Sequence, residues 1–576
     1  MAQDALRRYF QAGSSRGTAS PPCAILWSMF FILALLAVMQ AQGLAAQSVP
    51  AAAEVVFENA RIYTGDAARP HAKALAVRNG RILAVGDDLR SHTGQQTRRV
   101  DLEGAAVIPG LIDSHAHMRG LGELLESFDL RHVGTVGAVA AIVQREAAKR
   151  RRGEWIRGRN WDQTNWGGHF PASADLDRAA PEHPVYLTRV DGHASWVNQR
   201  ALKLAGITAD TPDPPGGRII RDERGEPTGV LIDRAQGLVS HLIPEATDEQ
   251  VRRRIGLAAK ECARLGLTGV HDAGIGPREL AAYRELIRRN ELPVRIYAMI
   301  GGEGPLWRDY LERGPEIGER LTIRSIKLMA DGAMGSRGAA FWQPYADEPG
   351  NRGLLILNRD AIEQVARAAV KAGFQVNTHA IGDRANRTVL DAYAAVLGGK
   401  NDKRFRIEHA QVVALPDFDL FAKNSVIASM QSTHATSDMR WAEKRLGPDR
   451  IAGAYAPKRF LRLGVPVANG SDFPVEEANP LWGFHAAITR QNHAGEPKGG
   501  WLPDQVLTRT EALRSWTLDG AYAAFEEEKK GTLMPGKLAD FVVLSQDIMK
   551  AAPAAIIKTE VLMTVLGGEV VYSKPR

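Results

Sequence analysis

Eight apolar, β-branched runs, separated by stretches long enough for helices, constrain the fold of this 576-residue chain most strongly. Strand-like and helix-like segments that alternate in this way are typical of a parallel sheet with crossover helices. Eight is the number of strands in a closed (β/α)₈ barrel, so we predict an α/β fold of that kind. The runs are Val107–His117, Thr268–Asp272, Val294–Ile300, Ser325–Asp331, Phe374–His379, Arg404–His409, Val426–Gln431 and Val465–Asp472.

Shorter strand-like runs lie at both ends of the chain. Near the start, two of them flank Asn79-Gly80, a dipeptide typical of a hairpin turn. Near the end, Val561–Tyr572 contains a second turn at Gly567-Gly568. We therefore expect a composite β-sandwich built from both termini. The predicted domains are residues 47–108 and 526–576 for the sandwich and residues 109–525 for the barrel.

The gap between the first two predicted strands is far longer than one βα unit. It holds Trp161, Trp166, His193 and a hairpin-like segment at Arg218–Asp233. Because the gap follows a barrel strand, it lies on the side where such barrels carry their active sites. We predict an inserted subdomain over about residues 130–262.

Residues 1–46 have the pattern of a secretory leader rather than of a folded domain. Three arginines precede the largely apolar run Cys23–Met39, and small residues follow at Gly43–Ala46. We predict cleavage near Ala45 or Ala46 and export to the periplasm or the medium, with no stable membrane span afterwards. The alternative is an uncleaved N-terminal membrane anchor, because the run is at the short edge of what spans a bilayer.

Charge and cysteine content exclude two classes of protein. The leader carries three Arg and one Asp, so its removal lowers the formal charge from +7 to +5, which gives no indication of nucleic-acid binding. Cys262 is the only cysteine beyond the leader, so the mature chain forms no internal disulfide. The partner that we expect is a small-molecule substrate. The sequence is also compatible with a homo-oligomer.

The segment Pro109–His117 contains two histidines, His115 and His117, that could bind a metal ion. Side chains two residues apart on a strand point to the same face, so His115 and His117 can present two imidazoles to one metal ion. A His-x-His pair alone is weak evidence, because many such pairs are merely hydrogen-bonded or exposed.

Three further ligand-type residues also end predicted strands: His379, His409 and Asp472. Catalytic residues of these barrels come from the carboxyl ends of several strands. Any one strand-end histidine is more often an ordinary hydrogen-bonded residue. Five residues in equivalent places indicate a metal site.

Lys327 lies inside an apolar predicted strand, where a lysine is disfavoured unless it is paired or chemically changed. Its ammonium would repel a cation, whereas a carbamate formed with CO₂ would offer two oxygens that can bridge two metals. The alternative is an ion pair with Asp331 or with a substrate carboxylate.

In these residues the chain resembles the amidohydrolase superfamily, and within it the family 3 branch of N-substituted formamide deformylase-like and YtcJ-like proteins. The resemblance covers nearly everything from Glu54 onward. The segments that carry it are Val107–His117, Lys327–Arg337, Thr378–Arg384, Ile407–Gln411, Gly470–Pro474 and Gly531–Leu544.

The resemblance implies a metal-dependent hydrolase of C–N bonds, of the amide or N-formyl type. It implies one or two metal ions, zinc or another divalent transition metal. Water activated by the metal would attack, with Asp472 accepting and returning the proton. The implied ligands are His115 and His117 on one metal, His379 and His409 on a second, carboxylated Lys327 between them, and Asp472 beside the reacting water.

Six further residues are candidates for supporting roles. Trp161, His193 and His434 are candidates for the substrate pocket, although Trp161 can equally belong to the core of the insertion and the two histidines can be structural. Asp113, Asp331 and Asp383 lie near the ligands in sequence and are candidates to orient them, although ordinary capping bonds would also explain them.

Other readings of the same site stay open. Barrel and metal do not fix the reaction, so a deaminase, an esterase or a metal-assisted isomerase remains an alternative. A catalytically dead binding protein is a further alternative, but no matching ligand position is lost here.

Overall fold

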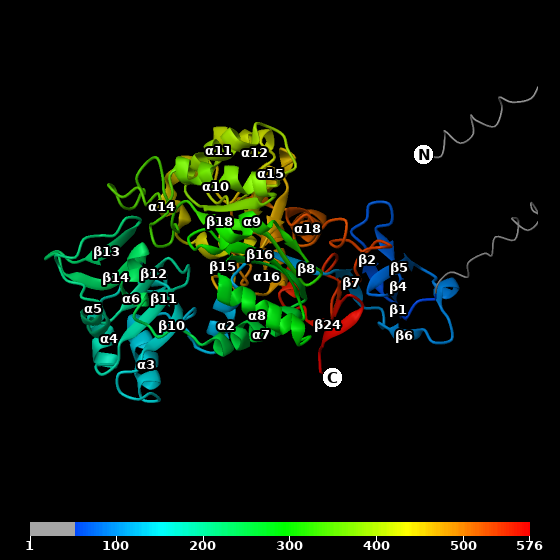
Figure 1. The fold of residues 1–576 in the computed structure, drawn as a ribbon, viewed down its shortest axis with the longest axis horizontal. Helices are drawn as coiled ribbons and strands as arrows, with labels where there is room; N and C mark the ends of the chain where they lie inside the picture. Colours follow the sequence, from blue (N-terminus) through cyan, green and yellow to red (C-terminus); the bar gives the residue numbers. More distant parts are fainter. Residues whose placement is uncertain (1–51, 576) are drawn as a thin grey trace, which may run out of the picture. The chain divides into compact units, whose positions relative to one another are not determined.

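Eight parallel strands form the predicted barrel in this computed structural model, which describes residues 52–575 (Figure 1). The predicted leader lies outside the described residues. The edge strands β8 and β22 meet, because Asp472 N donates to His115 O at 2.8 Å. In hydrogen-bonded order, the strands are β8 (Leu111–Ala116), β15 (Leu267–Ile275), β16 (Arg295–Gly301), β18 (Leu321–Met329), β19 (Gln375–Ala380), β20 (Arg406–His409), β21 (Ile427–Met430) and β22 (Val467–Asn469).

Amphipathic helices pack on the outside of these strands. Helix α7 (Asp248–Arg264) starts at a capping box of Thr247 and Gln250, and its buried residues join the barrel core. Helix α10 (Arg359–Ala372) ends at Gly373, whose φ of 81° suits glycine. Other helices that contribute to this core are α8 (Pro277–Arg288), α9 (Leu306–Arg313), α11 (Asp383–Leu397), α12 (Phe418–Lys423), α15 (Pro457–Arg462), α16 (Pro480–Thr489) and α17 (Arg509–Ser515).

The predicted first strand, Val107–His117, is in fact two strands. β7 (Ala106–Pro109) pairs with β2 (Arg61–Tyr63) and β23 (Phe541–Leu544) outside the barrel, and β8 pairs with β15 inside it. Gly110 separates them, and a Cβ at this position would lie 2.2 Å from Thr268 Oγ1. The close approach of Thr268 therefore requires glycine where the chain passes from one sheet to the other.

Two sheets outside the barrel contain the strands of the chain ends, as the predicted composite fold requires. Asn79 and Gly80 both have positive φ, at 49° and 71°, and close the predicted hairpin. Phe57 and Phe541 pack edge to face in the core, with ring centroids 4.8 Å apart. One sheet is β5 (Arg81–Gly86), β4 (Ala74–Arg78), β1 (Val55–Glu58) and β6 (Arg98–Asp101); the other is β25 (Glu569–Ser573), β24 (Val561–Leu566), β23 (Phe541–Leu544), β7, β2 (Arg61–Tyr63) and β3 (His71–Ala72).

A separate six-stranded sheet follows β8 and α2 (Met118–Leu125) in the chain. Its core has Trp161 and Trp196 at its centre, with the helices α3 (Val136–Ala147) and α4 (Ser173–Ala179) packed against it. The predicted hairpin at Arg218–Asp233 is present as β13 (Gly217–Arg221) and β14 (Pro227–Asp233), two antiparallel strands at one edge of the sheet. The strand order is β13 (Gly217–Arg221), β14 (Pro227–Asp233), β12 (Ala194–Val197), β11 (Val185–Arg189), β10 (Ile156–Trp161) and β9 (Phe128–Asp129). We call this sheet with its helices the insertion.

Buried polar contacts join the sandwich to the barrel at the start of β16 and near the end of α7. Arg295, the first residue of β16, donates to both carboxylate oxygens of Asp540, at 2.8 and 2.9 Å. Thr564 Oγ1 donates to Ala263 O at 2.7 Å. Among residues 52–575, no helix combines the length and the apolar character needed to cross a bilayer.

Candidate metal centre

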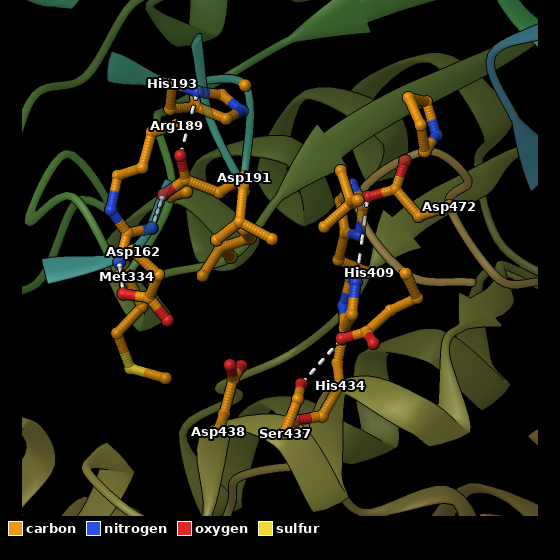
Figure 2. A pocket seen from close by; sticks show the side chains of 18 of the residues that line it. Asp162, Arg189, Asp191, His193, Met334, His409, His434, Ser437, Asp438 and Asp472 are labelled. Carbon is orange, nitrogen blue, oxygen red and sulfur yellow. Dashed lines mark hydrogen bonds and ion pairs between the residues drawn. The ribbon is translucent and has the colours of Figure 1, made fainter. Parts of the chain in front are cut away.

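A cavity of about 1150 Å³ lies at the carboxyl ends of the barrel strands. Barrel residues and insertion residues both line it. In Figure 2, Asp191 of the insertion lies across the cavity from His409 and Asp472 of the barrel. The insertion therefore forms a wall of the space in which a substrate would meet the strand ends.

His115 and His117 lie side by side at the end of β8, with ring centroids 5.5 Å apart. His115 Nδ1 lies 2.6 Å from Glu408 Oε2, and His117 Nδ1 lies 3.0 Å from the carbonyl oxygen of Ala273. Because Nδ1 of each ring is engaged, Nε2 is the nitrogen that remains to ligate a metal. The period-two spacing of the strand thus brings both rings to one place.

Asp472 follows β22 in a left-handed conformation, with φ of 60°. Its Oδ1 lies 3.2 Å from His117 Nε2 and 3.6 Å from His115 Nε2. Burial raises the pKa of Asp472, but the two imidazoles outweigh burial and hold that pKa well below its usual value. Gly470 allows this approach, because a Cβ there would lie 2.6 Å from His115 N. The carboxylate is therefore ionised beside both imidazoles.

His115, His409 and Asp472 form a buried cluster whose possible ligand atoms all lie within 4.8 Å of one another. His409 Nδ1 is 2.7 Å from Gln431 Oε1. Within the described chain, the buried atoms His115 Nε2 and Asp472 Oδ1 make no hydrogen bond. Buried polar atoms normally have partners, and imidazole and carboxylate are ligands that transition metals accept, so this donor set fits a metal ion.

Burial also favours the protonation states that metal binding needs. It lowers the pKa of both His115 and His409, which keeps their imidazoles neutral. A neutral imidazole has a lone pair to donate, whereas an imidazolium has none.

His379 and Lys327 lie next to this cluster. The His379 ring is 4.6 Å from the His409 ring, and His379 Nε2 is 3.4 Å from Asp331 Oδ1. Lys327 is only 7% exposed and lines the cavity, and burial lowers its pKa. All five predicted strand-end residues and Lys327 thus lie together in one cavity.

The alternative ion pair between Lys327 and Asp331 is absent from the described residues. Asp331 instead accepts three backbone N–H bonds, from Ala340, Ile381 and Gly382, at 2.8 to 3.0 Å. Burial raises the pKa of Asp331 to about 7. Its carboxylate therefore fixes the loops that follow β18 and β19 and approaches His379.

His193 and His434 both line the cavity, as expected for pocket residues. His193 Nδ1 lies 2.6 Å from Asp233 Oδ1. Burial lowers the pKa of His193, but the hydrogen bond to Asp233 outweighs burial and raises it overall. His434 Nε2 lies 3.8 Å from Asp472 Oδ2, and its ring is stacked 5.9 Å from that of His409.

Trp161 does not line the cavity, in contrast to the expected pocket wall. It is fully buried in the insertion, where its Nε1 donates to Leu187 O at 2.8 Å. Its ring packs within 6.1 to 6.5 Å of those of Trp166, Phe170 and Trp196. The structure supports the alternative, that Trp161 belongs to the core of the insertion.

Asp113 and Asp383 do not bond the ligand imidazoles. Asp113 accepts from His115 N and from both Ser471 N and Ser471 Oγ, so it joins the backbones of β8 and the Asp472 loop. Burial raises its pKa to about 7. Asp383 accepts from Trp342 N at 3.0 Å, at the start of α11. The side chains that contact the imidazoles are instead Glu408 and Gln431, which are not among the predicted site residues.

Comparison with known proteins agrees with this geometry. A family model described as "Amidohydrolase family" matches residues 98–572. Protein LONG AFTER FAR-RED 3 of Arabidopsis thaliana is 35% identical, over 90% of this chain and 92% of that protein. The putative amidohydrolase YtcJ of Bacillus subtilis is 31% identical, over 90% of this chain and 100% of that protein. N-substituted formamide deformylase of Arthrobacter pascens is 28% identical, over 90% and 98%.

A solved structure of an uncharacterized metal-dependent hydrolase from Pyrococcus horikoshii is also similar. It superposes with a TM-score of 0.71 at 28% identity, over 87% of this chain and 99% of that chain. Barrel, buried cluster and relatives together define a metal-dependent hydrolase. The chain belongs to the amidohydrolase family, in its family 3, as the resemblance predicted.

Proposed function

We propose that this protein hydrolyses a C–N bond of the amide or N-formyl type, releasing a carboxylic acid and an amine. The observation that carries the proposal is the buried cluster of His115, His409 and Asp472 on the wall of the cavity. The chain's similarity to N-substituted formamide deformylase, whose name states that it deformylates an N-substituted formamide, supports this bond type.

The residues that would hold metal are His115, His117, His379 and His409, together with Asp472 and Lys327. A donor set rich in imidazole and carboxylate suits zinc. When bound, such a metal would supply Lewis acidity and a water that ionises near neutral pH. Binding of two ions would require Lys327 to be an anionic carbamate, because an ammonium between two cations is repelled.

Asp472 is the residue that would move the proton. Its carboxylate is buried, lies beside both His115 and His117, and borders the cavity. From there it would accept the proton of the attacking water and return it to the leaving nitrogen as the C–N bond breaks.

His193 would donate a hydrogen bond to the developing oxyanion. Asp233 holds its Nδ1, which leaves Nε2 for the cavity, and the ring lies 5.3 Å from that of His379. A donor fixed before the reaction stabilises charge that appears only in the transition state.

A substrate screen tests the proposal. Zinc-loaded protein is assayed against N-formyl amines, N-acyl amines, cyclic amides, esters and aminated heterocycles, with Asp472→Asn as the matched control. We expect the wild type to turn over a formamide or an amide, and D472N to do so at a rate lower by about 10²-fold or more. Turnover of esters or aminated rings alone would reject C–N hydrolysis of the amide type and favour an esterase or a deaminase.

A further inference from the structure

Five arginines line the cavity, and one of them has no side-chain partner within residues 52–575. Arg189 bonds Asp162 and Asp191, and Arg440 bonds Asp162 and Asn165. Arg131 donates to the carbonyl of Pro474, and Arg234 pairs with Glu303 at 3.5 Å. Within the part of the chain that the structure describes, the Arg159 side chain makes neither a hydrogen bond nor an ion pair.

Arg159 lies near the end of β10, in the wall that the insertion contributes to the cavity. Its Nε is buried without a hydrogen-bond partner, and burial lowers the pKa of its guanidinium. An arginine nonetheless stays charged in a protein. Glu123, Asp472 and Asp191 act on this charge from a distance, but none of them bonds the Arg159 side chain among residues 52–575. A partly buried charge without a bonded counter-ion is costly, which favours an anionic ligand at this point.

The acids of the same wall do not compete for Arg159. Asp162 and Asp191 are bonded by Arg189, and Asp233 is bonded by His193. Among the described residues, Arg159 therefore carries a positive charge that no acid bonds directly, and it shares one cavity with His117 and Asp472.

We propose that Arg159 is a specificity residue that binds a carboxylate of the substrate while the scissile C–N bond lies at the histidine cluster. The planar fork of a guanidinium matches the two oxygens of a carboxylate. The substrate class is accordingly an N-formyl or N-acyl amine that carries a carboxylate, as in an N-acylated amino acid. This inference depends on the proposed function for the bond that is cleaved, but not for the binding of the anion.

The test compares N-formylglycine with N-formylglycinamide, in which a neutral carboxamide of similar size replaces the carboxylate. Zinc-loaded wild type is expected to have a kcat/KM for the acid about tenfold or more above that for the amide, the size expected for a charge-assisted hydrogen bond. Arg159→Gln should bring this ratio close to one, mainly through KM for the acid. An equal ratio in wild type and R159Q would overturn the proposal.

Arg157→Gln is the matched control. Arg157 lies on the same strand, two residues earlier, but is 43% exposed, pairs with Glu123 and does not line the cavity. It should keep the wild-type ratio, and circular dichroism should show that both variants are folded. Loss of the ratio in R157Q as well would count against a specific role for Arg159.

A binding measurement separates this proposal from the proposed function. If the wild type hydrolyses neither compound, the proposed reaction fails, and calorimetry with N-acetylglycine and N-acetylglycinamide still tests the site. We expect zinc-loaded wild type to bind the acid about tenfold or more tightly than R159Q does, and both proteins to bind the amide equally. Equal affinity of wild type and R159Q for the acid would overturn the carboxylate site.

Discussion

The Nδ1 atom of His115 lies 2.6 Å from the Oε2 atom of Glu408, and both side chains are almost completely buried. The two residues are 293 positions apart, on the barrel strands β8 and β20. The contact fixes which nitrogen of His115 faces Asp472 and increases the basicity of the ring. Glu408 is therefore a positioning residue for the candidate metal centre.

Replacing Glu408 with Gln should weaken zinc binding by about 10- to 100-fold, because the neutral amide supports the imidazole less well. Titration against a competing chelator measures the affinity. Glu526→Gln is the control, since Glu526 is also largely buried but bonds Lys530 and Thr322, near the first residues of β18. Unchanged zinc affinity in E408Q would show that Glu408 has only a structural role.

Chelation should abolish turnover, and adding zinc back should restore it, because the cluster alone offers no equivalent nucleophile or Lewis acid. The zinc-loaded protein should also unfold at a higher temperature than the metal-free protein, since a ligand that binds the folded state stabilises it. Elemental analysis is expected to give one to two equivalents. Full activity of chelated, metal-free protein would contradict the metal-dependent reaction.

Lys327→Ala should lower the metal content and abolish turnover if the lysine is a carbamate bridge. A short carboxylic acid in solution should then restore part of both, because it supplies the missing oxygen ligands. Lys327 has no ion pair among the described residues, so the substitution breaks no salt bridge. A K327A variant with a full metal complement and wild-type turnover would exclude the bridge.

The convergence of the candidate metal ligands in one cavity was predictable from sequence because two regularities act together. Alternation along a strand puts His115 and His117 on one side, and parallel strands bring their carboxyl ends to one rim. His379, His409 and Asp472 satisfy the second rule and do converge. The run Val107–His117 follows both regularities, but it forms two strands that separate at Gly110. The close approach of Thr268 to Gly110 is visible only in the folded structure.

Partners supplied by distant segments were not predictable in the same way. Glu408 was not predicted as a site residue. A glutamate inside an apolar strand could have indicated a buried partner, but nothing in the sequence points to His115 as that partner. Arg159 has no bonded acid among the described residues because Arg189 and His193 bond the neighbouring acids. The sequence alone does not show which side chains these acids bond. Trp161 was ambiguous because an aromatic residue suits a core and a pocket equally well.

Trp161→Phe should destabilise the protein by about 1–3 kcal/mol, because it leaves the buried carbonyl of Leu187 without its donor. KM should stay within about twofold of wild type, since Trp161 does not line the cavity. Urea denaturation and steady-state kinetics measure the two effects. A large rise in KM without loss of stability would contradict this prediction and indicate that Trp161 contacts the substrate.

The N-terminal leader is expected to direct export and to be removed. Its arginines, its apolar run Cys23–Met39 and its small residues at Gly43–Ala46 have the order that signal peptidase substrates share. N-terminal sequencing should therefore show that protein from the fractionated host begins near Gln47.

Replacing Ala45 and Ala46 with bulky residues should block cleavage and leave the chain in the membrane fraction, because the apolar run then stays attached. A wild-type chain that begins at Met1 in the membrane fraction would favour the uncleaved anchor, and the same chain in the cytoplasm would exclude export.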